Sequence, residues 1–252
     1  TKDWGPWGTT QANLGFDVVD IEPAGLSEGV FKDINLITSF DDTAQFRELL
    51  WDGALAIPAY STGGNPYDVK AEIDNIVLDL VANGTIDPNK VYVSFLYDKK
   101  SGKGKYTIGS DVVNPKIVDV DSKIILRQSN YRPIPYLWTT TLKSVKVGDQ
   151  EISGIDPSIT RFSFDTGSSA LKGDANKMEE LLLKIGLYEP DIEYTMGIDI
   201  DGNDGKLVLT NKQYNRIIEE GEKKGTKQKQ IQPLAGVPNL WLQGTTLLED
   251  LY

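Results

Sequence analysis

Residues 162–169 read Phe-Ser-Phe-Asp-Thr-Gly-Ser-Ser, and this stretch decides how the rest of the chain is interpreted. An apolar run that is typical of a β-strand leads into Asp165, and Gly167 follows in a tight turn. Hydroxyl and backbone N–H groups in such a turn donate hydrogen bonds to the carboxylate and favour its ionised form. The simpler interpretation is a strand that ends in a turn with a capping Asp, because Asp-Thr-Gly alone is a short motif.

Composition narrows the chemistry that the chain can perform. Its 252 residues include neither cysteine nor histidine. The absence of cysteine excludes thiol nucleophiles, disulfide bonds and thiolate metal sites. The absence of histidine excludes a Ser-His-Asp triad and a zincin helix. Hydrolytic chemistry must therefore rest on carboxylates, Lys, Tyr, or a Ser activated by a base other than His.

The formal net charge of the chain is -11. Nucleic acids and anionic membranes bind clustered Lys and Arg, so this charge argues against both as partners. The sequence contains no run of about eighteen apolar residues, which excludes a membrane-spanning helix within it.

The local pattern is mostly β, with short β-type runs between turns rich in Gly, Asn, Asp and Pro. Hairpin turns are expected at residues 101–104 and 201–205. A calcium loop at residues 199–205 is disfavoured, because the positions that an EF-hand needs as Gly and Glu are Asp204 and Thr210. The expected strands are residues 16–21, 90–97, 105–108, 117–120, 123–126, 137–147, 161–164 and 206–209.

Few helices are expected. Residues 68–81 carry apolar side chains at helical spacing and stop before Gly84. A second helix is predicted from an Asp capping residue to a Gly over residues 174–186, and a third from residue 210 through Ile217 and Ile218. The segment 219–230 is expected to be a charged surface loop.

Several stretches resemble the pepsin-type aspartic proteases. Residues 164–173, Phe-Asp-Thr-Gly-Ser-Ser-Ala-Leu-Lys-Gly, resemble the active-site turn of that family's second lobe. Residues 136–152 resemble the pair of strands before that turn. Residues 238–248, Pro-Asn-Leu-Trp-Leu-Gln-Gly-Thr-Thr-Leu-Leu, resemble the segment in which a hydrophobic pair and a Gly cross behind the turn.

The first half of the chain resembles the family's first lobe in the same order. Residues 8–17 resemble the flap hairpin and the strand after it, and residues 51–56 resemble the first lobe's own crossing segment. Residues 75–84, 91–96 and 104–111 resemble that lobe's helix and closing strands. Because these segments follow one another in the same order as in the family, each match is stronger evidence than it would be alone.

The resemblance implies a mostly β, bilobal pepsin-like acid protease fold with a few short helices. Residues 1–112 would form the remainder of the N-terminal lobe from the flap onward, and residues 113–252 the C-terminal lobe with the Asp-Thr-Gly turn. The family's first lobe begins with another Asp-Thr-Gly turn, upstream of the flap. We therefore expect a missing N-terminal segment or a separate light chain to carry that first catalytic Asp.

The resemblance also implies an aspartic endopeptidase, in which two Asp residues share one proton and activate a water for hydrolysis of a peptide bond. Asp165 would be one of the two, and no metal or cofactor is implied. The residues implied to support the turn or to contact substrate are Thr166, Gly167, Ser168 and Ser169. The residues implied to form the flap over a polypeptide substrate are Trp7, Gly8 and Thr9, with Trp4 as the alternative to Trp7.

Two departures from the family pattern keep a second interpretation open. Ala56 stands where the first lobe's crossing Gly is expected, and Thr245 follows Gly244 where the family usually has Asp. The alternative is a catalytically inactive protease-like protein that uses its cleft for polypeptide binding or scaffolding. A second Asp-Thr-Gly or Asp-Ser-Gly upstream would favour the enzyme.

The resemblance and one sequence motif indicate where the protein is located. The resemblance to these proteases implies zymogen processing and either secretion or an acidic endomembrane compartment. Asn83-Gly84-Thr85 is a glycosylation sequon and favours the same route.

Overall fold

The computed structural model divides the chain into two compact units. One unit comprises Thr1–Ile57 with Val69–Val91, and the other Pro58–Asp68 with Tyr92–Tyr252. The residues that the structure describes are 2–3, 9–18, 30–40, 84, 92–98, 103–109, 127–128, 137–198, 204–218 and 222–248.

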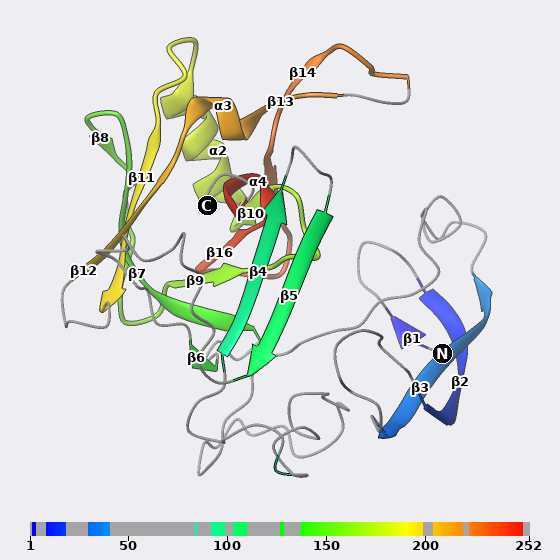
Figure 1. Ribbon diagram of the computed structural model, residues 1–252. Coiled ribbons are helices and arrows are strands. Elements are labelled where there is room, and N and C mark those ends of the chain that lie inside the picture. The colour runs from blue at the N-terminus through cyan, green and yellow to red at the C-terminus, as the bar shows by residue number, and fades with distance from the viewer. Residues whose placement is uncertain are drawn as a thin grey trace. The chain divides into compact units, whose positions relative to one another are not determined.

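The first unit contains a three-stranded antiparallel sheet in the order β1-β2-β3 (Figure 1). Its strands are β1 (Lys2–Asp3), β2 (Thr9–Val18) and β3 (Val30–Phe40). β2 contains the first three residues of the strand predicted at 16–21 and begins earlier. The pairing of β2 with β3 shifts register twice, between Gln11 and Ala12 and between Gly15 and Asp17, as at β-bulges.

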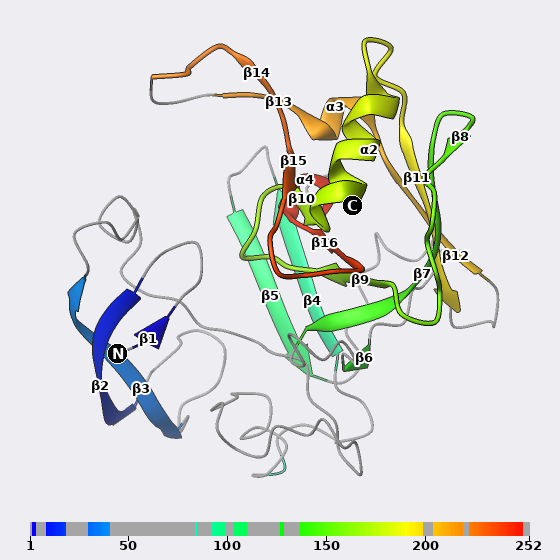
Figure 2. The ribbon, with the colours of Figure 1, turned by 180° about the vertical axis from the view of Figure 1, so that it is seen from behind.

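The second unit is built on a mixed sheet, which runs in the order β12-β11-β7-β9-β16-β10-β15 (Figures 1 and 2). The short strands β6 and β8 also pair with β7. The pairs β9–β16 and β10–β15 are parallel, and the other pairs along this path are antiparallel. The strands are β6 (Arg127–Gln128), β7 (Trp138–Val147), β8 (Gln150–Glu151), β9 (Arg161–Phe164), β10 (Leu171–Gly173), β11 (Ile192–Ile198), β12 (Asp204–Leu209), β15 (Ile231–Pro233) and β16 (Leu240–Gln243).

Two hairpins complete the strands of this unit. β4 (Tyr92–Asp98) and β5 (Lys103–Gly109) pair antiparallel, which confirms the strands predicted on either side of residues 101–104. β13 (Asn215–Ile217) and β14 (Lys227–Lys229) form a second antiparallel pair that projects from the unit in both views (Figures 1 and 2).

The helix α2 (Ala175–Ile185) confirms the helix predicted over residues 174–186. The Asp174 carboxylate accepts hydrogen bonds from the backbone N–H groups of Asn176 (3.0 Å) and Lys177 (3.3 Å), which is the geometry of an N-cap. Gly186 ends the helix with φ 49°, a left-handed conformation that favours glycine. The helix contacts β15, β10 and β7, and its inner side chains are buried.

One main hydrophobic cluster lies between α2 and the sheet. Phe162 of β9 contacts the ring of Tyr194 from β11, with 5.0 Å between centroids, and Tyr194 contacts the ring of Trp241 from β16 at 6.2 Å. These rings tie three separate strands of the sheet to one another, and all three side chains are buried. Burial of rings of this size supplies much of the hydrophobic stabilisation of the unit.

The helix predicted from residue 210 ends much earlier than expected. α3 (Asn211–Tyr214) is a single turn that starts with a capping box between Thr210 and Gln213. The chain then enters β13, where Ile217 pairs with Lys227. The prediction of helix at Ile217 and Ile218 is wrong, because β-branched side chains favour the strand pairing that the following segment offers. The segment 219–230, predicted as a loop, contributes β14 to this pairing.

The described part of the chain is mostly β with a few short helices, as predicted. A final helical turn, α4 (Thr245–Leu248), follows β16 directly. The predicted helix at 68–81 and strands at 117–120 and 123–126 lie outside the described residues. The bilobal pepsin-like arrangement and its boundary near residue 112 stay predictions, because the two units are each described by themselves.

Candidate active site

The carboxylate of Asp165 lies at the point where β9 ends and a turn begins. The Asp165 N–H donates to the carbonyl oxygen of Gln243 at 2.9 Å, which fixes the backbone of the turn to β16. The N–H of Gly167 donates to Oδ1 of Asp165 at 2.9 Å, and the hydroxyl of Ser168 donates to Oδ2 at 2.8 Å. Each carboxylate oxygen therefore accepts one hydrogen bond from the turn itself.

In this arrangement the Asp165 carboxylate can accept further hydrogen bonds. The side chain is neither fully buried nor fully exposed. A carboxylate has about four acceptor positions, and the two bonds described above occupy two of them. The remaining positions can accept a bond from a water or share a proton with a second carboxyl group. Both donors orient the carboxylate, as a catalytic base requires.

β16 supports the turn from behind. Gln243 of this strand pairs with Phe164 of β9 on one side and with Leu171 of β10 on the other. Three backbone bonds follow along the chain: the N–H groups of residues 244, 245 and 246 donate to the carbonyl oxygens of residues 170, 168 and 169, at 3.1, 2.8 and 3.1 Å. The segment thus crosses behind the turn, as the resemblance implies for residues 238–248.

Gly244 permits this close crossing. A Cβ atom at this position would lie 2.4 Å from the carbonyl oxygen of Ser168 and 2.5 Å from the carbonyl carbon of Ser169. Real Cβ atoms do not approach backbone this closely, so any other residue would move one of the two segments. The backbone position of the Asp165 turn therefore depends on a glycine 79 positions later in the sequence.

Gln243 is a supporting residue that the sequence interpretation missed. Its side chain is fully buried, and its Nε2 atom donates to the hydroxyl of Thr246 and to the carbonyl oxygen of Gly244, both at 3.2 Å. These bonds tie β16 to the first turn of α4, directly behind the active-site turn. The available signal was a lone polar residue in an otherwise apolar run, Leu-Trp-Leu-Gln, just before Gly244.

The predicted site residues differ in where the structure places them. Ser168 bonds to Asp165, whereas the side chains of Thr166 and Ser169 are exposed at the surface of the turn. Thr9 begins β2 in the first unit and pairs with Asp3 of β1. The other two predicted flap residues, Trp7 and Gly8, lie outside the described residues, as does Ala56.

No family model and no curated protein matches this chain. Within the described ranges, Asp and Glu side chains form no group of three that could hold a metal ion. In the same ranges, no helix has the length and hydropathy needed to cross a membrane. The functional argument therefore rests on the geometry around Asp165.

Proposed function

We propose that this chain is an aspartic endopeptidase, or the larger chain of one, that hydrolyses peptide bonds with a water activated by two Asp residues. Asp165 is one member of the pair. The observation that carries the proposal is the geometry of its turn, in which Gly167 N–H and Ser168 Oγ each donate to one carboxylate oxygen. A capping Asp at an ordinary strand end does not need the further support from β16 and Gly244.

The chemistry follows from two carboxylates that share one proton. At about 3 Å separation both cannot be ionised, so one is a base and the other an acid. The base takes a proton from a water, which attacks the carbonyl carbon of the peptide bond, while the acid protonates the carbonyl oxygen. The base then passes this proton to the amide nitrogen as the C–N bond breaks, the acid takes back a proton from a hydroxyl of the tetrahedral species, and the amine and a carboxylic acid are released. The donors at Asp165 keep its oxygens oriented toward the reacting atoms throughout.

The second carboxylate has to come from elsewhere than Asp165. Asp-Thr-Gly occurs once in the chain and Asp-Ser-Gly not at all. We propose that a preceding segment or a light chain provides it, and that the segment around Trp7, Gly8 and Thr9 closes over an extended polypeptide substrate. A secreted or acidic compartment belongs to the same proposal.

The second candidate is a protease-like protein without catalysis, which binds a polypeptide in the cleft of the same fold. The single Asp-Thr-Gly and the Thr245 that follows Gly244 favour it. Its binding function would survive the loss of the Asp165 carboxylate, whereas peptide hydrolysis would not.

The composition of the natural protein distinguishes these candidates. We would purify it from its source and determine the intact mass and N-terminal sequence of every chain present. The enzyme predicts a chain or segment with a second Asp-Thr-Gly or Asp-Ser-Gly, together with cleavage of an unfolded protein at acid pH. A complete protein without a second such motif and without cleavage would support the binding protein instead.

A further inference from the structure

The end of α2 carries large apolar side chains in solvent. Leu187 and Tyr188 are each 97% exposed, and Leu183, one turn earlier on the helix, is 76% exposed. We call these three residues the apolar tip. Single exposed apolar residues are common on protein surfaces, but adjacent ones that are almost completely exposed are unusual and mark interaction sites.

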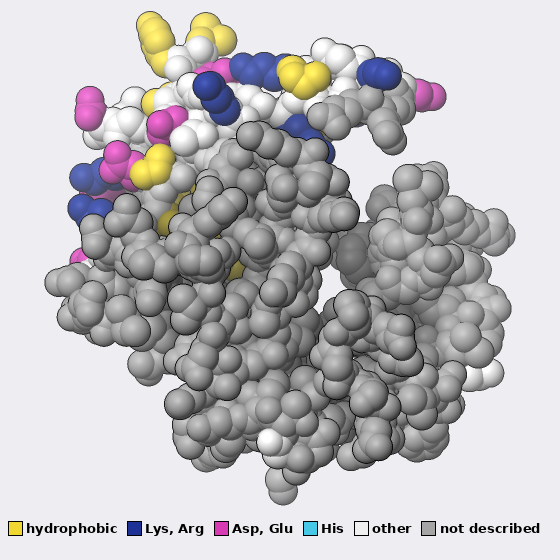
Figure 3. Space-filling model, viewed as in Figure 1, with side chains coloured by type: hydrophobic (Ala, Val, Ile, Leu, Met, Phe, Trp, Pro, Cys, Tyr) yellow, Lys and Arg dark blue, Asp and Glu magenta, His cyan; other side chains and the backbone are white. Residues whose placement is uncertain are grey.

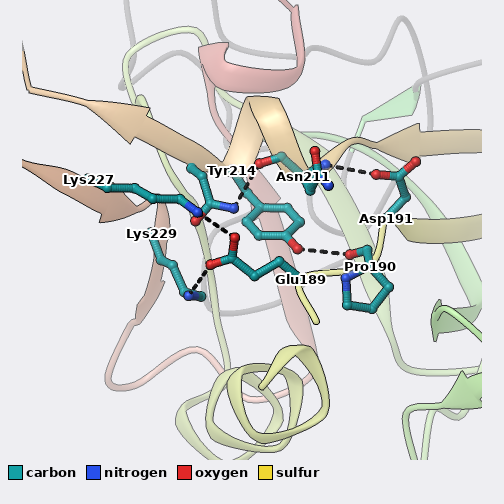
Figure 4. A network of polar contacts seen from close by, with 8 residues as sticks. Glu189, Pro190, Asp191, Asn211, Tyr214, Lys227 and Lys229 are labelled. Carbon is teal, nitrogen blue, oxygen red and sulfur yellow. Dashed lines mark hydrogen bonds and ion pairs between the residues drawn. The ribbon is translucent and has the colours of Figure 1, made fainter. Parts of the chain in front are cut away.

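Hydrogen bonds hold the chain that follows the apolar tip, and Figure 4 shows the bond between Tyr214 and Pro190. The Glu189 N–H donates to the carbonyl oxygen of Ile185 at 3.1 Å, and the Tyr214 hydroxyl donates to the carbonyl oxygen of Pro190 at 2.8 Å. Burial, together with the carboxylates of Glu189 and Asp191, raises the pKa of Tyr214 to about 12, so this donor stays protonated at physiological pH. The tip is therefore presented at a fixed place.

Basic residues of the β13–β14 hairpin lie next to the apolar tip. Glu189, the residue after Tyr188, accepts hydrogen bonds from the ammonium groups of Lys227 and Lys229, the latter at 2.7 Å. The same hairpin carries Ile217, which is 53% exposed. Further exposed cations on α3 and this hairpin are Lys212, Arg216, Lys223 and Lys224.

The charge of the molecule is unevenly distributed along the sequence. Residues 211–229 contain six Lys or Arg and three Glu, a net charge of +3, whereas the whole chain carries -11. The remaining residues therefore carry -14. In Figure 3, hydrophobic and Lys or Arg side chains, with Asp or Glu side chains among them, follow the upper edge of the described surface, over the end of α2 and the hairpin.

We propose that the apolar tip and the basic β13–β14 hairpin together dock this protein on the surface of an anionic membrane. Apolar insertion and attraction of lysines to anionic lipid are the two contributions that interfacial binding combines. The tyrosine suits the boundary between hydrocarbon and headgroups, because its ring is apolar and its hydroxyl is polar. The overall charge of -11 and the glutamates of the segment 211–229, Glu219, Glu220 and Glu222, oppose such binding, and the apolar tip and the local charge of +3 have to outweigh them.

The positive charge of the hairpin favours an anionic lipid surface over a second copy of the chain as its partner. Two copies meeting at this face would bring two basic hairpins together, and like charges in apposition disfavour association. An anionic lipid surface offers opposite charge over its whole area and accepts a projecting tip without a matching pocket. An acidic protein partner would also offer negative charge, but it would need a cavity that fits Leu187 and Tyr188. The binding experiment distinguishes such a partner from lipid.

Vesicle sedimentation tests the proposal with the purified protein. We expect binding to vesicles of phosphatidylcholine with about one third phosphatidylserine, and little binding to phosphatidylcholine alone. The double variant K223Q/K224Q should bind about 25-fold more weakly, since each lysine near such a surface contributes roughly fivefold. The double variant L187S/Y188S should bind at least about tenfold more weakly. Matched controls are K143Q/K206Q and I159S/V208S, which change exposed or half-exposed residues outside the tip and the hairpin.

A fluorescent label gives a second readout that keeps Leu183 and Tyr188 of the apolar tip. Because the chain has no cysteine, Leu187→Cys provides a single labelling site for an environment-sensitive dye. We expect a blue shift of its emission with the anionic vesicles and none for the same dye at Val208→Cys. Equal binding to both vesicle types, or a tip variant that binds like its control, overturns the proposal. Self-association or capture of an acidic protein through the tip, without vesicle binding, overturns it as well.

Discussion

At the level of single residues, the candidate site depends more on the crossing strand β16 behind Asp165 than on the Asp-Thr-Gly motif itself. Asp156 makes a comparable local pattern, with the N–H and the hydroxyl of Ser158 both donating to its Oδ1, at 2.9 and 2.7 Å. These bonds lower the pKa of Asp156 from its ordinary value. Asp156, however, lies in an exposed turn without the crossing strand that holds Asp165. It is therefore a natural control for tests of the site.

Replacement of Asp165 by Asn should abolish peptide hydrolysis and leave the fold intact. The amide oxygen can still accept from Gly167, and the Ser168 hydroxyl can turn to accept from the amide, but an amide cannot share a proton. We expect kcat to fall by at least roughly 10²–10⁴-fold, with an unchanged circular dichroism melt. Asp156→Asn should keep full activity. Retention of most of the activity in the Asp165 variant would remove this residue from the mechanism.

Gly244→Ala should disturb the turn from behind. Its Cβ has no room against Ser168 and Ser169, so we expect a loss of about 1–3 kcal/mol in the free energy of unfolding. Activity should fall by more than tenfold, because small displacements of catalytic groups are costly. Gly236→Ala is the control: φ is +77° there but no atom lies within 4 Å of the added Cβ. It should lose about 1 kcal/mol and keep its activity. Equal activity losses in the two variants would contradict the role given to Gly244.

At the scale of elements, the β13–β14 hairpin is attached to the end of α2 through one carboxylate. Glu189 has φ 45°, a conformation that is unusual for a residue other than glycine. Its ion pairs with Lys227 and Lys229 join the loop after α2 to β14. Both pairs are partly exposed, so their effect on global stability is small and their effect on the position of the hairpin is the larger one.

The Glu189 attachment should depend on pH. Hydrogen bonds from Lys227 and Lys229 lower the pKa of Glu189 from its ordinary value. A carboxylate whose pKa is lower in the folded state stabilises that state above its unfolded pKa, and this stabilisation is lost as the pH falls through the folded pKa. In Glu189→Gln at neutral pH, we expect faster amide hydrogen exchange in residues 215–229 and a melting temperature lower by no more than a few degrees. Glu222→Gln, on the same hairpin, should exchange like the parent. The difference between parent and Glu189→Gln should disappear in strong acid, and a difference that persists there would contradict this account.

At the scale of the whole molecule, the sequence predicted local structure well where short-range signals decide it. The helix from an Asp174 cap to Gly186 was correct because both ends carry their own capping residues. The helix predicted from residue 210 was correct for its first turn, Asn211–Tyr214, and wrong after it, because the second half finds a strand partner that sequence spacing does not show. Propensity is a weak guide where pairing with a distant segment competes.

The candidate site was predictable only in part. The strand and turn around Asp165 follow from local sequence, and the need for Gly244 followed from the family resemblance. The buried role of Gln243 could not be derived, since a polar residue in an apolar run is equally compatible with an edge position. β9, β10 and β16 together support the turn through parallel and antiparallel pairings between residues 68 to 79 positions apart in the sequence.

We propose that Asp165 is half of a proton-sharing pair, and the pH dependence of peptide hydrolysis tests this proposal. We would measure kcat/KM of the complete protein on an unfolded protein substrate from pH 2 to pH 8, with Asp165→Asn in parallel. A pair that must hold one proton works between its two apparent pKa values. The account predicts a bell-shaped profile with its maximum in acid, and no hydrolysis by the variant at any pH. A maximum at or above neutral pH, or a variant with the profile of the parent, would contradict it.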